Sequence, residues 1–237
     1  MGYKLTWVYI RPNGTEQKIR PTRFTPWVNT VLYCPLEDDI LDHSGNHTMT
    51  LTTSSYGTVA KDSTWFYYFN GGYITSENYT WPSEVTMSMW LKKETKHTSE
   101  AWCWAFSGHY RSSSPYHYFA IDTWNSDNTH NAEFTIYNGS ARSVTTNAIT
   151  EWVWTHVALT YSATTWLVAY VNGVSVGTYA TTWNITSYNW PTNIWATFAY
   201  TNQFYEGYIS EVIVESVPRT AQEVTGYYNL TKRNYGL

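Results

Sequence analysis

The chain has 237 residues, of which 19% are aromatic and only 14% are charged, and its formal net charge is −4 at pH 7. Abundant aromatic, Ser and Thr residues suit half-buried strands and disfavour a helical bundle. An acidic chain with scattered Lys and Arg lacks the basic surface that nucleic-acid binding requires. No apolar run approaches the length of a membrane span, so membrane insertion is not expected.

The first predicted element is a hairpin over residues 3–20, with strands at YKLTWVYI and EQKIR around a turn at RPNGT. Asn13 and Gly14 accept the positive φ that such a turn requires. A lone hairpin cannot bury its apolar side chains, so we predict that residues 1–27 are a hairpin and linker that attach the protein to a partner or to copies of itself. The alternative is an edge hairpin of the main domain. The candidate attachment residues are Trp7, Tyr9, Ile10 and Ile19.

Residues 28–237 are predicted to form one all-β domain, because short strands and turn signals recur along them. The clearest stretch is 154–177, where WTHVALTYS and TTWLVAYV alternate faces and Asn172-Gly173 marks a tight turn. A short helix is expected over 220–228, with Thr220 as its N-cap. The spacing of strands and turns predicts two packed antiparallel sheets.

Five ordered segments between residues 32 and 224 resemble the laminin-G-like, concanavalin A-like lectin/glucanase jelly rolls. The segments are LYCPLEDDILDHSGN, FNGGYI, VTMSMWLK, WTHVALTYSATTWLVAYVNGVSVG and YEGYISEVIV. The resemblance implies a two-sheet antiparallel jelly-roll sandwich. It does not fix the function, since this fold serves lectins, hydrolases and structural modules alike.

The order of segments, a hairpin and linker before a lectin-like domain, also resembles phage and prophage structural proteins, and the N-terminus has no signal-peptide pattern. We therefore expect a non-enzymatic virion surface protein of decoration or fibre type, attached to other virion proteins and binding host or environmental glycans. The alternative is an extracellular carbohydrate-binding or adhesion module of a larger secreted protein.

Glycan binding is expected at loops on one rim of the sandwich, where aromatic and amide residues occur together. The C–H face of a pyranose packs on an aromatic ring, and amides satisfy its hydroxyls. The candidate glycan-binding residues are Tyr110, Trp124, Asn125, Tyr188, Asn189 and Trp190. Tryptophans in strand patterns are expected to be packing residues; they include Trp90, Trp152, Trp154 and Trp166.

No cofactor is required, but a structural calcium ion is a second possibility. Asp42, Ser44 and Asn46 offer oxygen ligands at alternate positions, and in the resembled family the strand carrying Glu211 runs near the opening strand. Carbonyls and water would have to complete the six to eight oxygens that calcium takes. Without a metal, the residues at 42 and 44 are ordinary turn formers.

The sequence shows no catalytic residues. A glycosidase needs two carboxyl groups held at a defined separation, and no pair is evident. His156 belongs to a strand signature and is expected to be packed and hydrogen-bonded rather than a base. Cys34 and Cys103 are expected to be buried reduced thiols, with one disulfide as the alternative.

Overall fold

The computed structural model describes the sandwich and the C-terminal helix but not every connecting segment. The described residues are 26, 28–37, 39–52, 58–61, 66–70, 72–93, 104–107, 119–124, 131–137, 140–181, 189–194 and 206–237. The predicted attachment residues fall outside these ranges, as do three candidate glycan-binding residues, namely Tyr110, Asn125 and Tyr188. Cys103 also lies outside them.

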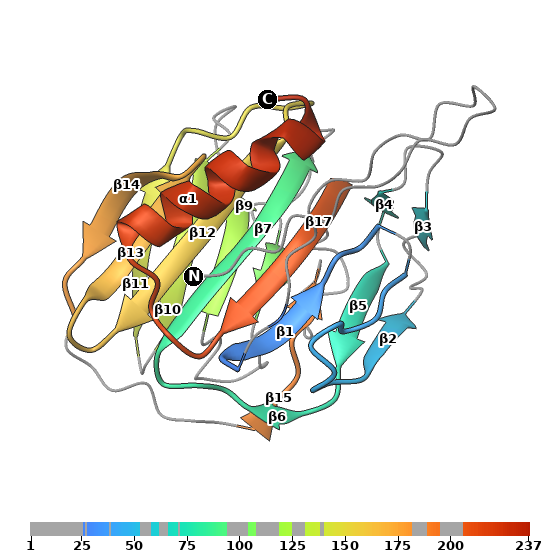
Figure 1. The fold of residues 1–237 in the computed structure, drawn as a ribbon, viewed down its shortest axis with the longest axis horizontal. Coiled ribbons are helices and arrows are strands. Elements are labelled where there is room, and N and C mark those ends of the chain that lie inside the picture. Colours follow the sequence, from blue (N-terminus) through green and yellow to red (C-terminus); the bar gives the residue numbers. More distant parts are fainter. Residues whose placement is uncertain are drawn as a thin grey trace, which may run out of the picture.

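Two antiparallel sheets packed face to face form the described part of the chain, as predicted (Figure 1). The eight-stranded sheet runs in the order β14 (Val174–Tyr179), β13 (Trp166–Val171), β12 (Thr155–Ser162), β7 (Val85–Lys93), β17 (Glu206–Glu215), β4 (Tyr67–Asn70) and β3 (Thr58–Lys61), with β1 (Thr30–Cys34) paired to β17. The seven-stranded sheet runs β11 (Ala141–Thr146), β10 (Asn131–Tyr137), β9 (Phe119–Trp124), β8 (Trp104–Ser107), β16 (Asn193–Ile194), β5 (Tyr73–Ser76) and β2 (Met49–Thr52). A ribbon of β6 (Tyr79–Thr80) and β15 (Asn189–Trp190) lies at one end.

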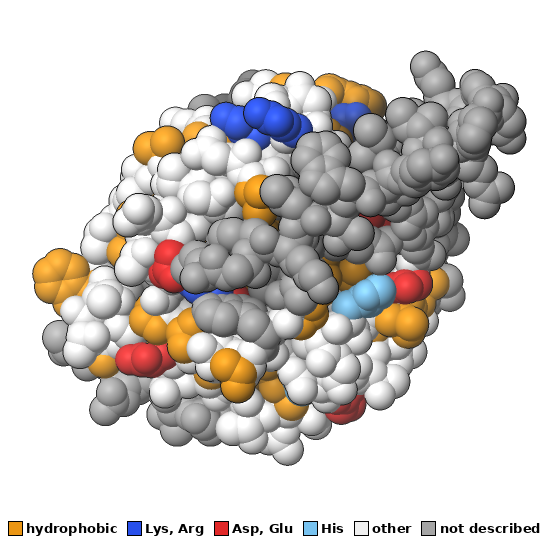
Figure 2. Space-filling model, in the orientation of Figure 1, with side chains coloured by type: hydrophobic (Ala, Val, Ile, Leu, Met, Phe, Trp, Pro, Cys, Tyr) orange, Lys and Arg blue, Asp and Glu red, His pale blue; other side chains and the backbone are white. Residues whose placement is uncertain are grey.

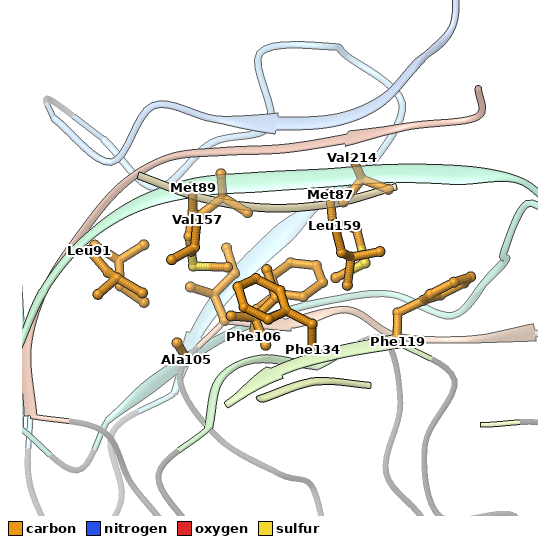
Figure 3. Close-up of a cluster of buried hydrophobic side chains, with 14 of the residues drawn as sticks. Met87, Met89, Leu91, Ala105, Phe106, Phe119, Phe134, Val157, Leu159 and Val214 are labelled. Carbon is orange, nitrogen blue, oxygen red and sulfur yellow. The ribbon is translucent and has the colours of Figure 1, made fainter. Parts of the chain in front are cut away.

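The hydrophobic core lies between the sheets, because alternate side chains of each strand point inward. Figure 3 shows aliphatic and methionine side chains of one sheet meeting phenylalanine rings of the other. The labelled residues are Met87, Met89, Leu91, Val157, Leu159 and Val214 from the first sheet, and Ala105, Phe106, Phe119 and Phe134 from the second. All are buried, and each large side chain contributes about 1.5–3 kcal/mol. With the interior filled by these side chains, a ligand is expected on an outer face or at an end.

The C-terminal helix α1 (Ala221–Thr231) covers one outer face of the eight-stranded sheet (Figure 1). Thr220 caps it as predicted, accepting from the Glu223 N–H while the Glu223 carboxylate accepts from the Thr220 N–H. Val224 packs on Ala158 and Tyr170. A 3-10 turn, η1 (Lys232–Tyr235), follows. Within the described residues no helix has the length and hydropathy of a membrane span.

The predicted hairpins over 154–177 are confirmed as β12, β13 and β14, with positive φ at Asn172 and Gly173. Two tryptophans were wrongly assigned to packing. Trp152 lies in a turn and Trp166 is the first residue of β13; their φ angles are 63° and 65°, and they are 57% and 42% exposed. Both rings therefore lie partly on the surface, whereas Trp90 is buried as expected.

His156 and Cys34 are both buried, as expected. The His156 ring packs beside Trp90 and Tyr227, with centroid distances of 5.3 and 5.5 Å. Neither ring nitrogen has a hydrogen-bond partner within the described chain, so the expected side-chain hydrogen bond is wrong. Burial lowers the pKa of His156 to about 3, so the ring is neutral near neutral pH. Cys34 is a free thiol whose pKa is raised by burial.

Candidate functional site

The ribbon of β6 and β15 carries two of the predicted glycan-binding residues. Asn189 pairs with Thr80 and Trp190 pairs with Tyr79. Asn189 is exposed. The Tyr79 hydroxyl is hydrogen-bonded to Thr192 Oγ1 at 2.5 Å, which links the ribbon to the start of β16. Burial raises the pKa of Tyr79 far above its usual value, so the phenol stays protonated.

An aromatic stack connects this ribbon with the core. The rings of His47 and Tyr79 are 4.0 Å apart, and those of Tyr79 and Trp81 are 5.4 Å apart. His47 Nδ1 is hydrogen-bonded to Glu77 Oε1 at 2.9 Å, and the Thr48 N–H donates to Glu77 Oε2 at 2.7 Å. Burial alone would raise the pKa of Glu77, but these bonds hold it below its usual value. The end of the sandwich that carries the ribbon is thus held by hydrogen bonds and includes one anionic side chain, Glu77.

Buried polar atoms at this end have no hydrogen-bond partner among the described residues. They are His47 Nε2, Trp81 Nε1, and Oδ1 and Nδ2 of Asn193. Asn193 is 1% exposed, and leaving such a group unsatisfied costs about 1–3 kcal/mol. Native structures rarely retain this cost without a reason, such as a bound water or a role in binding. Asn193 is therefore the polar group here that most needs a partner.

Asn193 lies within a row of small residues that crosses the outer face of the seven-stranded sheet. From β2 to β11 the register aligns Thr50, Thr75, Asn193, Ser107, Ala120, Thr135 and Ser143. Thr50 is exposed and Thr75 is half-buried, so the row is open on the side of Asn193 that is nearer β2. We call Thr50, Thr75, Asn193, Asn189 and Trp190 the ribbon-end site.

The structure separates the three described candidate glycan-binding residues, Trp124, Asn189 and Trp190, instead of gathering them on one rim. Ala120 is aligned with Asn193 through Ser107, and Trp124 lies four residues further along β9. At about 3.4 Å per residue the offset is about 14 Å. Asn189 and Trp190 precede β16 on the other side of the row. For these three residues the single rim was a wrong expectation, because Trp124 lies at the opposite end of the sheet.

The sequence did not reveal one pair of acidic residues. Asp122 of β9 is the direct antiparallel partner of Glu133 of β10. Cβ atoms of directly opposite residues are about 4.5–5.5 Å apart. Glu133 is half-buried. Both residues lie in strands, but the sequence carries no signal for the register of these strands, so the pairing could not be predicted.

The candidate calcium loop is held by hydrogen bonds that converge on the Asp42 carboxylate. Asp42 Oδ1 accepts from the N–H groups of Tyr33 and Ser44, and Oδ2 accepts from Ser44 Oγ and from the N–H groups of Asn46 and His47, all within 3.1 Å. The turn-forming role of Asp42 is confirmed. Its carboxylate is already well satisfied, so a cation would have to compete with these donors.

Glu211, the fourth candidate ligand, has a partner on the C-terminal helix. Its carboxylate accepts a short hydrogen bond from the Tyr227 hydroxyl. Burial and then the Glu211 charge raise the pKa of Tyr227, which keeps the phenol protonated as the donor. In the described part of the chain no three His, Cys, Asp or Glu residues are arranged to hold a metal ion. Calcium binding stays a prediction.

Comparison with known proteins identifies the fold. The family model described as the concanavalin A-like lectin/glucanases superfamily matches residues 68–225. No curated protein sequence matches the chain. The receptor-binding domain of botulinum neurotoxin mosaic serotype C/D is similar in structure, with a TM-score of 0.66 and 13% identity over 85% of this chain and 50% of that one.

Two further solved structures are similar. Domain 4 of AbnA, an extracellular arabinanase from Geobacillus stearothermophilus, has a TM-score of 0.62 and 18% identity over 84% of this chain and 97% of that one. The binding domain of Paraclostridial Mosquitocidal Protein 1 has a TM-score of 0.63 and 14% identity over 85% of this chain and 52% of that one. The chain thus spans about half of the toxin domains and nearly all of the arabinanase domain. At these identities the likeness shows the fold alone.

Proposed function

Because the chain belongs to the concanavalin A-like lectin/glucanase superfamily, we propose that it is a non-catalytic carbohydrate-binding module that binds saccharide at the ribbon-end site. The observation that carries the proposal is the buried Asn193 amide, whose donor and acceptor lack partners among the described residues. Asn193 is 1% exposed, so we expect a sugar hydroxyl, which is both a donor and an acceptor, to reach the two amide atoms through a bridging water.

Other groups at the ribbon-end site suit the same ligand. Thr50 and Thr75 supply hydroxyls on the open side of Asn193, and Asn189 supplies an exposed amide. A Trp beside amides offers the ring on which the C–H face of a pyranose packs. The arabinanase domain was solved in complex with arabinotriose, and the two other structures named above are a receptor-binding domain and a binding domain. These neighbours support binding rather than hydrolysis.

Single substitutions locate the site, since the two candidate tryptophans lie at opposite ends of the sheet. A glycan array first identifies the saccharide that binds best. We expect Trp190→Ala to lower the affinity for that saccharide by at least about tenfold, as measured by calorimetry. Trp124→Ala is the matched control and should bind normally. Asn193→Ala should also lose binding without loss of thermal stability, because the amide makes no hydrogen bond to described residues. Loss with Trp124→Ala alone would move the site to the other end.

A glycosidase is the second candidate, favoured by the opposition of Asp122 and Glu133. Retaining enzymes hold two carboxyl groups about 5–5.5 Å apart. We expect no hydrolysis of a panel of aryl glycosides and polysaccharides by the wild-type protein. Hydrolysis that disappears in Glu133→Gln, with the fold intact, would contradict the non-catalytic proposal.

We also propose the narrower role of a virion surface protein, attached through residues 1–27, on the basis of the resemblance to phage structural proteins. An extracellular module is the alternative. Deleting residues 1–27 should leave thermal unfolding unchanged and abolish co-sedimentation with assembled particles. A truncated protein that is destabilised yet still sediments would favour an edge hairpin of the sandwich.

Calcium is proposed as a structural ion bound near Asp42. Adding calcium should then raise the melting temperature above its value in a chelator, and Asp42→Asn should abolish that rise. Equal melting temperatures in calcium and chelator would leave the loop as a turn stabilised by its own hydrogen bonds.

A further inference from the structure

An aromatic row lies on the part of the eight-stranded sheet that α1 leaves uncovered. Lys92, Tyr208 and Tyr68 are consecutive cross-strand partners on β7, β17 and β4. The rings of Tyr208 and Tyr68 are 5.2 Å apart, and Trp154 lies 6.2 Å from Tyr208. All four side chains are half-buried. We call the surface formed by these four side chains the floor; the strands of the sheet support it.

Trp152 stands beside this floor in an unfavourable backbone conformation. Its φ of 63° lies in the left-handed region, which costs a bulky side chain free energy and is usually taken by Gly or Asn. Its N–H donates to the Lys93 carbonyl at 2.7 Å, which fixes the turn to the end of β7. The indole is 57% exposed. Trp152 therefore presents an exposed aromatic ring beside the floor, where one ligand can contact both.

The lysine of the row lies between the two aromatic groups. Lys92 Nζ is 5.1 Å from the Tyr208 ring centroid and 5.9 Å from that of Trp152. These cation–π contacts place the ammonium without neutralising it. None of the ion pairs among the described residues involves Lys92. Its charge is therefore available to an anion.

More basic residues lie near the same end. Tyr235 of η1 packs 4.8 Å from Trp154, and η1 also contains Lys232 and the exposed Arg233. Figure 2 shows Lys and Arg side chains gathered at the upper edge of this face, where α1 ends. In a protein of net charge −4, this edge is locally basic. An anionic ligand is complementary to it.

We propose that Trp152, Tyr208 and Lys92 form a second saccharide site, distinct from the ribbon-end site and selective for sugars that carry a carboxylate. The Trp152 ring packs on the C–H face of the pyranose, and Tyr208 borders it. Lys92 Nζ donates to the carboxylate, a charge-assisted hydrogen bond stronger than one to a hydroxyl.

The proposal is tested first on an array of oligosaccharides that end in a uronate or a sialate, each paired with its carboxyl-reduced counterpart. Calorimetry then measures the affinity for the acidic glycan that binds best. We expect the acidic member to bind at least about tenfold more tightly than its reduced counterpart. Lys92→Met should remove that preference, and Trp152→Gly should abolish binding of both members. Glycine adopts the φ of Trp152 freely, so the variant should fold.

Trp166→Gly is the matched control, because Trp166 is also an exposed tryptophan with positive φ but is the first residue of β13, directly after the turn from β12. It should bind like the wild type. Normal acidic-glycan binding by Trp152→Gly, or no acidic glycan bound by the wild type, would overturn the proposal. If Trp190→Ala alone removes binding, this second site fails while the proposed function stands; if no saccharide binds the wild type, both fail.

Discussion

Lowering the pH should destabilise the protein through His156. The ring is fully buried between Trp90 and the aromatic residues of α1, and its pKa is about 3 because burial disfavours the charged form. A small pocket beneath α1 reaches the ring and is also lined by Glu215, Arg219, Glu223 and Tyr227, among other residues. Arg219 is paired with both glutamates.

The direction and size of the effect follow from proton linkage. In the unfolded chain His156 has a pKa of about 6.5, so below that pH the unfolded state binds a proton that the folded state does not. The stability that the neutral ring contributes is present above pH 6.5 and is lost as the pH falls toward 3. Between pH 7 and pH 5 the loss is about 2 kcal/mol.

Urea unfolding at pH 7 and at pH 5 measures this loss in the wild type and in His156→Met. Carboxylates titrate in both proteins, so the difference between their pH dependences isolates the histidine. Met is uncharged and adaptable in packing, and no hydrogen bond to a described residue is lost. The variant should be about 2 kcal/mol less sensitive to this pH change. An equal pH dependence would refute the buried neutral histidine.

Three further substitutions test the packing around the sheets by thermal or urea unfolding. Arg219→Ala should cost about 3 kcal/mol, since it leaves the buried Glu215 carboxylate without the two guanidinium hydrogen bonds of 2.8 Å. Thr220→Ala should cost about 1 kcal/mol by removing the cap of α1. Gly177→Ala should cost about 1–3 kcal/mol, because the new Cβ would lie 2.5 Å from Val144 Cγ1. Losses below half these values would contradict the corresponding contact.

Local signals in the sequence were sufficient to predict the hairpins over 154–177. The Asn172-Gly173 turn fixes where β13 reverses, and alternation then fixes which residues face the core. The N-cap of α1 was predictable for the same reason, because a Thr three residues before a Glu satisfies free N–H groups within one turn.

Non-local pairing explains what the sequence could not show. Asn193 belongs to a strand of only two residues, and its neighbours Thr75 and Ser107 come from strands more than 80 residues away. The opposition of Asp122 and Glu133 likewise depends on register rather than on spacing. Residues that come together only through strand pairing cannot be grouped before the sheet is known. Trp124 and Trp190 match a glycan site by residue type alone, and for this reason they were grouped incorrectly.

Trp152 shows how alternation can mislead at the start of a strand. With Trp154 it has the two-residue spacing of a strand, yet β12 begins at Thr155 and the backbone turns at Trp152. Periodicity reports which residues would share a face if the strand continued, and it does not report where the strand starts. The ring that was expected in the interior is exposed in consequence.

The two residues Trp90 and Lys92 lie on the same face of β7, two positions apart, and differ in what covers them. Trp90 stacks on Tyr235 at 4.1 Å and donates its indole N–H to Thr231, so the last turn of α1 and η1 seal it. The chain then turns at Gly236 with φ of 79°, which ends η1, and Lys92 is half-buried. Tyr235 also packs 4.8 Å from Trp154, so the ring that covers Trp90 borders the floor beside it. Rings that already pack on one another cost little ordering on binding, and the half-buried Lys92 beside them adds a charge, which favours the use of this floor as a ligand surface.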